Sequence, residues 1–254
     1  MDVTIGIVQS EYDPLDTDKL MEDIDKVKKA DIICFPECFA AGRSLEETAW
    51  YLQRICKDSE KILDTIKNAT EKCVIFPLLE REEQKLYNTT YVFKNKEIIG
   101  KYIKIHVYPW GEFFFSAGSE HPVFDIGGFT IGVMTCFDAA FPETARVLSL
   151  KGAKIIIVSS SWPEEAKYLW EIRLCARAQD NQVFVVAANR CGKIGTEVYL
   201  GKSMVVNPRG EIIAQCGNME QVMLVNIDLN QIEEERNREP IYYGFDKTLY
   251  EHLL

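Results

Sequence analysis

Short runs of apolar residues recur along the chain, and most are rich in Val and Ile and bounded by Gly, Pro, Asn or Asp. Runs of this length and composition are typical of β-strands. The pattern predicts strands at 3–9, 32–36, 73–79, 89–93, 98–104, 129–135, 154–159, 183–188, 203–207, 212–214 and 222–227. Residues 155–158 and 183–186 are apolar at consecutive positions, so we expect both faces of these two strands to be covered.

Helical periodicity separates several of these strands. It predicts helices at 17–29, 44–70, 141–151 and 164–181. Ser44 and Glu47 have the spacing of a capping box, in which each side chain binds the other residue's backbone N–H. Pro142 suits the first turn of a helix, and Gly152 suits the position just beyond its end. Strands and helices in this order indicate a mixed sheet, or two packed sheets, with helices outside.

Composition limits the class of protein. With 254 residues, 47% of them hydrophobic, and no Pro/Gly/Ser-rich linker, the chain is expected to form one domain over residues 1–254. A net charge of −10 disfavours binding to nucleic acid or to anionic membranes. The eight cysteines are scattered, which suits a reducing compartment. The N-terminus has no basic segment of a signal peptide, and no apolar run approaches the roughly 18 residues of a membrane span, so we expect a cytoplasmic protein.

Three apolar runs end at residues that can do chemistry: Glu37, Lys104 and Cys136. A thiolate nucleophile needs a group that accepts its proton and a positive group that meets the developing oxyanion. A carboxylate among apolar neighbours, as in the segment 35–39, should have a raised pKa, which suits a general base near neutral pH. An acid, a base and a thiol at strand ends therefore indicate a thiol-dependent hydrolase.

Each of these residues also has a structural interpretation. A buried cysteine usually acts as a small hydrophobic side chain, and carboxylates and lysines at strand ends are ordinary. Lys101 fits the composition as well as Lys104 does. Cys136 is distinguished by its position between a strand and the helix that starts at Pro142, where a tight turn would expose its sulfur. This arrangement resembles a nucleophile elbow without the glycines of that motif.

Taken together, the three segments resemble the nitrilase superfamily, the carbon–nitrogen hydrolases with a Glu-Lys-Cys triad, and point to its amidase or N-carbamoyl amidohydrolase branch. The matching segments are 35–37, 101–106, 135–138 with 141–143, 170–181, 185–190, 201–203 and 207–210. They occur in the family's order and extend over essentially the whole chain.

The resemblance implies an α/β fold of four layers, α-β-β-α, around two mixed central sheets, with the triad at the strand ends. It implies that Glu37 moves the protons, that Cys136 forms a thioester, and that Lys104 and the backbone N–H of Phe137 hold the oxyanion. Glu112 resembles a second glutamate that positions substrate or assists proton transfer in amidases. The chemistry so implied uses covalent catalysis, with no cofactor and no metal.

The same resemblance places residues in a substrate pocket. Trp110 lies in an aromatic segment, and Trp162 follows another predicted strand end. A carboxylate at the far end of the substrate is expected to meet Arg190 or Arg43. The alternative for the aromatic segment of Trp110 is the hydrophobic core, and the alternative for Glu112 is a surface loop.

We expect the substrate to be a small linear amide or an N-carbamoyl compound, with release of ammonia, or of ammonia and carbon dioxide. The pair Phe137-Asp138 favours amides over nitriles by resemblance to the amidase-like branches. Two alternatives are a non-enzymatic dimeric protein on the same fold and a thiol sensor that uses Cys136. A zinc site at Cys34, Cys38 and His106 is disfavoured because Cys34 lies inside a predicted strand.

The C-terminal segment 231–254 is charged, then aromatic, then apolar at its end. Chain ends normally fray unless they are anchored. The anchors of this segment include Leu249, Tyr250, Leu253 and Leu254, which predict packing on the body or across a partner subunit. A homodimer is the expected assembly, by resemblance to the family.

Overall fold

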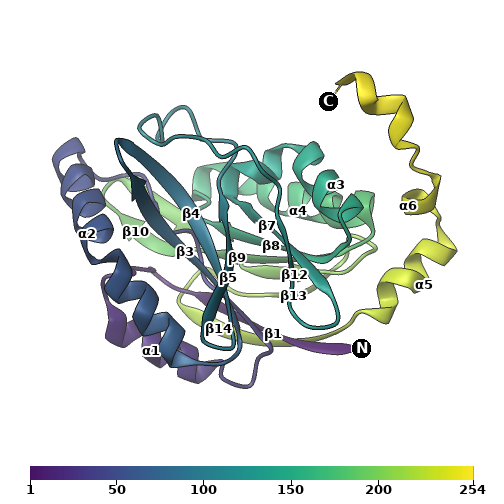
Figure 1. The fold of residues 1–254 in the computed structure, drawn as a ribbon, viewed down its shortest axis with the longest axis horizontal. Helices are drawn as coiled ribbons and strands as arrows, with labels where there is room; N and C mark the ends of the chain where they lie inside the picture. Colours follow the sequence, from purple (N-terminus) through teal and green to yellow (C-terminus); the bar gives the residue numbers. More distant parts are fainter. Residues whose placement is uncertain (254) are drawn as a thin grey trace.

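Two six-stranded sheets lie face to face in a computed structural model that describes residues 1–253, with side chains as far as residue 250 (Figure 1). The first sheet has the order β14 (Gln221–Asp228), β1 (Asp2–Gln9), β2 (Ile32–Cys34), β3 (Cys73–Glu82), β4 (Lys85–Lys94) and β5 (Glu97–Ile103). The second has the order β13 (Ile212–Gln215), β12 (Met204–Val206), β9 (Phe184–Asn189), β8 (Ala153–Ser160), β7 (Thr130–Thr135) and β6 (Val123–Asp125).

Both sheets are mixed. Parallel pairs join β1, β2 and β3 in one sheet and β7, β8 and β9 in the other, and the remaining pairs are antiparallel. The separate hairpin of β10 (Cys191–Ile194) and β11 (Glu197–Leu200) was not predicted, nor was β6. Because parallel strands all end at the same edge, their carboxyl ends bring residues from distant parts of the chain together.

Helices cover the outer faces of both sheets (Figure 1). The first sheet packs on α1 (Thr17–Lys26) and α2 (Leu45–Ala69), and the second on α3 (Pro142–Leu150) and α4 (Lys167–Asn181). The chain then continues through α5 (Asn230–Arg238), α6 (Ile241–Gly244) and the 3₁₀ turn η3 (Lys247–Leu253). The predicted four-layer α-β-β-α sandwich is therefore confirmed.

Alternation along β8 explains the run of consecutive apolar residues at 155–158. Ile155 and Ile157 point into the core between the two sheets, whereas Ile156 and Val158 point into the core beneath α3 and α4. Successive side chains of a strand face opposite sides, so a strand covered on both sides is apolar throughout.

The starts of α2 and α3 were predicted correctly from local sequence signals. Ser44 and Glu47 form the capping box at the start of α2, and Pro142 is the first residue of α3. The predicted helix 164–181 is divided into a 3₁₀ turn, η2 (Glu164–Ala166), and α4. Among the described helices, none is long and apolar enough to cross a lipid bilayer.

Candidate active site

Glu37, Lys104 and Cys136 come from three different strand ends and meet at the same edge of the sandwich. Lys104 directly follows β5, Cys136 directly follows β7, and Glu37 lies three residues beyond β2. The two sheets are joined here by hydrogen bonds. Ser159 Oγ donates to the carbonyl of Phe35 at 2.8 Å, and the Glu37 N–H donates to the carbonyl of Ser160 at 3.3 Å. Glu37 therefore lies on a segment that β8 holds in position.

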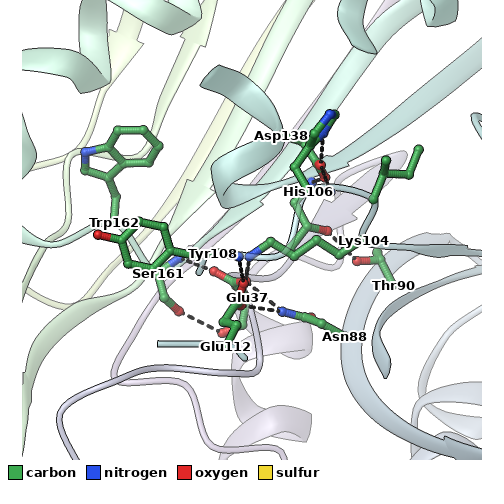
Figure 2. Close-up of polar contacts among 12 residues, drawn as sticks. Glu37, Asn88, Thr90, Lys104, His106, Tyr108, Glu112, Asp138, Ser161 and Trp162 are labelled. Atoms are coloured by element: carbon green, nitrogen blue, oxygen red, sulfur yellow. Dashed lines mark hydrogen bonds and ion pairs between the residues drawn. The ribbon is translucent and has the colours of Figure 1, made fainter. Parts of the chain in front are cut away.

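The Lys104 ammonium lies between two buried carboxylates (Figure 2). Its Nζ donates to Oε1 of Glu37 at 2.9 Å and to Oε1 of Glu112 at 2.8 Å. Asn88 Nδ2 donates to the same two oxygens, at 2.8 Å and 3.2 Å. No more than 5% of any of the three charged side chains is exposed, so all of this chemistry is shielded from bulk water.

Backbone N–H groups occupy the second oxygen of each carboxylate. The Ser161 N–H donates to Oε2 of Glu37 at 2.9 Å, and the Tyr108 N–H donates to Oε2 of Glu112 at 2.7 Å. Buried carboxylates remain ionised only when their oxygens are paired in this way. The two glutamates are thus held in single orientations.

Burial raises the pKa of Glu37, and the nearby Glu112 charge adds to this, while Lys104 and Asn88 oppose it. Burial alone would lower the pKa of Lys104, but the charges of Glu37 and Glu112 hold it well above its ordinary value. Lys104 is therefore a permanent cation. Glu37 is a stronger base than an exposed glutamate.

Cys136 occupies a strained turn at the end of β7. Its φ of 47° lies in the left-handed region that non-glycine residues rarely adopt, and it opens the 3₁₀ turn η1 (Cys136–Ala140). Strain of this kind persists where the surrounding structure imposes it, and it is common at reactive residues. Burial and the charge of Glu37 raise the pKa of the Cys136 thiol, whereas Lys104 and the Ser160 hydroxyl lower it. The thiol therefore needs a base beside it before it can react.

Asp138 fixes this turn from within. Its Oδ2 accepts from the Tyr102 hydroxyl at 2.6 Å and from the Thr135 N–H at 2.8 Å. Its Oδ1 accepts from the His106 N–H at 2.9 Å and lies 2.9 Å from Nδ1 of the same residue (Figure 2). Tyr102 and His106 flank Lys104 in the chain, so one buried carboxylate connects the turn of Cys136 to the segment that carries the lysine. These contacts give Asp138 a structural role in holding the turn of Cys136.

The sequence profile of the carbon-nitrogen hydrolase family matches residues 8–237. The chain belongs to this family. The 2-oxoglutaramate amidase of Bacillus subtilis is 30% identical to it over 227 residues, which are 88% of each chain. The nitrilase of Pyrococcus abyssi is 31% identical over 92% of this chain and 93% of its own length.

Solved structures of other carbon-nitrogen hydrolases share the fold. The enzyme from Helicobacter pylori G27 superposes with a TM-score of 0.88 at 23% identity, over all of this chain and 98% of its own. A mutant amidase from Nesterenkonia sp. AN1, with a TM-score of 0.81 at 21% identity, covers 96% of this chain and 97% of its own. That structure shows covalent addition of an acetamide moiety at its active-site cysteine.

Arg190, a predicted pocket residue of this carbon-nitrogen hydrolase, is surrounded by protein groups and not by a pocket. Arg190 is fully buried, and its guanidinium donates to the carbonyls of Glu11, Glu37 and Cys38 and to Ser161 Oγ, at 3.0–3.3 Å. The prediction that Arg190 meets a substrate carboxylate is corrected by these contacts, because its donors are engaged inside the protein. Arg190 instead fixes the backbone at Glu37 and Cys38.

The aromatic residues predicted for the pocket also differ from one another. Trp162 is buried, its indole N–H donates to the Ala166 carbonyl at 2.9 Å, and its ring packs on Trp170. Most of the Trp162 side chain therefore belongs to the hydrophobic core. Trp110 is 84% exposed, at the rim of the segment that carries Glu112. The Phe137 ring is half-buried and meets Tyr108 edge-on, 5.2 Å between centroids.

Arg43 lies over the Tyr51 ring and faces a cavity of 490 Å³. The cavity is lined by Arg43, Glu46, Glu47, Trp50, Tyr51, Ile194 and Gly195. No triad residue lines it, so only a substrate that extends well beyond the triad would reach Arg43. Among the described side chains, no group of three His, Cys, Asp or Glu is arranged to hold a metal ion.

Sequence reasoning missed several residues of the site. Asn88 lies within β4, which is buried over residues 88–93, and no catalytic or binding role is evident from its place in the strand. The N–H groups of Tyr108 and Ser161 act through the backbone, which carries no residue-specific signal. A possible signal for Asn88 was the polar run 88–90 inside an otherwise buried strand, because polar side chains that are buried need partners.

Proposed function

We propose that this protein hydrolyses the C–N bond of a small linear amide or N-carbamoyl compound through a thioester on Cys136. The observation that carries the proposal is the buried cluster of Glu37, Lys104 and Glu112 at the edge where the strained turn of Cys136 ends β7. Relatives that include a 2-oxoglutaramate amidase support amide hydrolysis. The acetamide adduct on the cysteine of a structurally similar amidase supports covalent catalysis.

In the first half-reaction Glu37 accepts the thiol proton, and the Cys136 thiolate attacks the carbonyl carbon. The carbonyl π electrons move to oxygen and form a tetrahedral intermediate. Two of the three N–H bonds of Lys104 point at Glu37 and Glu112, which leaves one N–H for the oxyanion, together with the backbone N–H of Phe137. Collapse of the intermediate breaks the C–N bond, and Glu37 returns the proton to the departing nitrogen as ammonia leaves.

In the second half-reaction Glu37 takes a proton from water, and the hydroxide attacks the thioester carbon. The same N–H groups hold the second oxyanion. The C–S bond then breaks, the thiolate recovers a proton from Glu37, and the carboxylic acid leaves. From an N-carbamoyl substrate the product is a carbamic acid, which decomposes to an amine or ammonia and carbon dioxide. Glu112 positions the Lys104 ammonium and the amide nitrogen.

A substrate panel tests the proposal. Small amides, carboxylate-bearing amides, N-carbamoyl amino acids and the nitriles of matching chain length are incubated with the protein, and ammonia release is followed. We expect an amide or N-carbamoyl compound to exceed the matching nitrile in kcat/KM by at least about tenfold, since a 1.4 kcal/mol preference already gives that ratio. Faster turnover of the nitriles, or no turnover of any member, would contradict the proposal.

We further propose that residues 231–254 belong to an interface between two copies of the chain. Gln182 anchors the start of this segment by donating to the Glu239 carbonyl and accepting from the Tyr242 N–H. Beyond these contacts Tyr243 and Leu249 are 59% and 64% exposed, and Figure 1 shows the last residues extending from the body. The predicted anchors Leu253 and Leu254 lie outside the residues whose side chains are described.

Truncation tests this interface. We expect the full chain to be a dimer and a chain ending at Glu239 to be a monomer, as measured by light scattering coupled to size exclusion. Apolar side chains left exposed on a monomer are the surface that pairing would bury. A dimer of the same stability in the truncated chain, or a monomeric full chain, would exclude the interface.

A further inference from the structure

A buried hydroxyl at the end of β8 has no hydrogen-bond partner among the described residues. Ser160 is fully buried, and its Oγ is one of the few buried side-chain oxygens without a partner. A buried hydroxyl without a hydrogen bond destabilises the folded protein, so its retention calls for an explanation. Its surroundings supply one.

The sheet register places this hydroxyl beside the candidate nucleophile. In the parallel pair of β7 and β8, Thr135 is opposite Ser159. Cys136, the first residue after β7, and Ser160, the last residue of β8, therefore lie at the same edge of the sheet, and η1 packs against β8 there. Side chains that follow paired positions of parallel strands lie next to one another.

A hydrogen bond from the Ser160 hydroxyl to the Cys136 sulfur depends on whether that sulfur is a neutral thiol or a thiolate. The Ser160 hydroxyl lies near enough to lower the pKa of the Cys136 thiol against the effect of burial, although its Oγ has no hydrogen-bond partner among the described residues. A neutral thiol is a weak acceptor, whereas an anionic acceptor forms short and strong hydrogen bonds. An unpartnered donor next to a thiol is what a thiolate would need.

The backbone of Ser160 fixes the position of this donor. Its carbonyl accepts from the Glu37 N–H at 3.3 Å and from the Arg190 N–H at 2.9 Å. The residue that carries the free hydroxyl therefore also holds the segment of the base. The hydroxyl stays beside the sulfur while a proton moves between Cys136 and Glu37.

We propose that the Ser160 hydroxyl donates a hydrogen bond to the Cys136 sulfur whenever that sulfur is anionic: when Glu37 removes its proton, and when the thioester C–S bond breaks. This inference rests on the proposed role of Cys136 as nucleophile. No bond to Ser160 is made or broken, and its proton stays on its oxygen. The hydroxyl stabilises the attacking thiolate and the leaving thiolate alike.

Substitution Ser160→Ala tests the inference because it removes only the oxygen. The alkylation rate of Cys136 by iodoacetamide is measured against pH, with the modified peptide quantified by mass spectrometry. We expect the pH midpoint of alkylation to rise and the rate at neutral pH to fall by about tenfold, which is the usual worth of a hydrogen bond to a charged group. On the best amide, kcat should fall by about the same factor and KM should stay within about twofold.

Two further variants separate the hydroxyl from structural effects. Ser160→Thr keeps the oxygen and should keep the wild-type pH midpoint. Thr144→Val removes another buried hydroxyl without a partner, in α3, and should leave the midpoint unchanged. Thermal unfolding should show Ser160→Ala at least as stable as the wild type, since the group removed was unpaired.

An unchanged midpoint and kcat in Ser160→Ala would overturn the inference, as would an equal rise of the midpoint in Ser160→Thr. Failure of the proposed function gives a different result, in which Cys136→Ala still hydrolyses the amide. The two outcomes are therefore distinguishable within one set of variants.

Discussion

Replacing Cys136 with alanine is expected to reduce amide hydrolysis by at least about 10⁴-fold, the scale on which loss of a catalytic nucleophile is felt. The thiol sits on the left-handed turn after β7, where the strain of its backbone is compatible with a reactive role. Glu37, Lys104 and Glu112 are held in the ion cluster, and the Ser160 hydroxyl is a much weaker nucleophile than a thiolate, so neither replaces the missing sulfur. Ammonia release from the best amide, compared with the wild type at equal concentration, measures the effect.

Cys175 provides the matched control. It is also a free, half-buried cysteine, but it lies in α4 away from the three strand ends. Cys175→Ala should keep full activity. Retained hydrolysis in Cys136→Ala would remove the proposed mechanism. Rapid, reversible oxidation of Cys136 in a protein that turns over no amide would favour the thiol sensor instead.

Replacing Lys104 with methionine is expected to lower kcat by about 10²–10³-fold, the usual result of removing one oxyanion donor, and to destabilise the fold by about 3–5 kcal/mol, the usual result of removing one partner from a buried ion pair. Methionine has a similar length but no charge, so Glu37 and Glu112 would remain buried without their cation. The free energy of unfolding, from urea denaturation, and kcat/KM measure the two effects. Wild-type stability in Lys104→Met would contradict the ion cluster.

The pH dependence of the activity that remains in Lys104→Met gives a second test of the Lys104 charge. The Lys104 charge opposes the rise in the pKa of Glu37 that burial causes. Its removal should raise that pKa further. A general base acts only when deprotonated, so activity is lost as pH falls through its pKa, and the acidic limb of the pH–rate profile should move to higher pH.

Lys101 is the control for this substitution. It was an equal candidate on composition, but its side chain is 36% exposed and pairs with Glu80 and Glu82 at the surface. Lys101→Met should cost no more than about 1 kcal/mol, the usual range of a surface ion pair, and should leave kcat unchanged. A comparable loss of activity in both variants would contradict the catalytic role proposed for Lys104, because an exposed lysine would then matter as much.

Much of the fold follows from patterns that act over a few residues. The short Val- and Ile-rich runs and the capping box at Ser44 are local, and both are found in the structure. The strand-end positions of Glu37, Lys104 and Cys136 were also readable, because a polar residue directly after an apolar run marks the point where a strand leaves the core.

The four-layer architecture was predicted from the resemblance to a family and not from these local signals. The packing of two sheets depends on contacts between residues far apart in the chain, and hydrophobic periodicity alone left a mixed sheet and two sheets equally open. The β10–β11 hairpin escaped prediction for the same reason. Its short strands form a two-stranded sheet of their own and carry mixed polarity.

The sequence by itself thus determined most of the helices and strands, the family and the three residues expected to do the chemistry. Only the tertiary structure decided what surrounds them. Asn88 donates hydrogen bonds to both carboxylates of the cluster. Arg190 was expected to bind a substrate carboxylate, but its guanidinium holds the backbone at Glu37. Ser160 lies beside the Cys136 thiol, and its hydroxyl has no hydrogen-bond partner among the described residues. The physical reason is that hydrogen bonding and burial depend on distances across the fold, which no spacing along the chain contains.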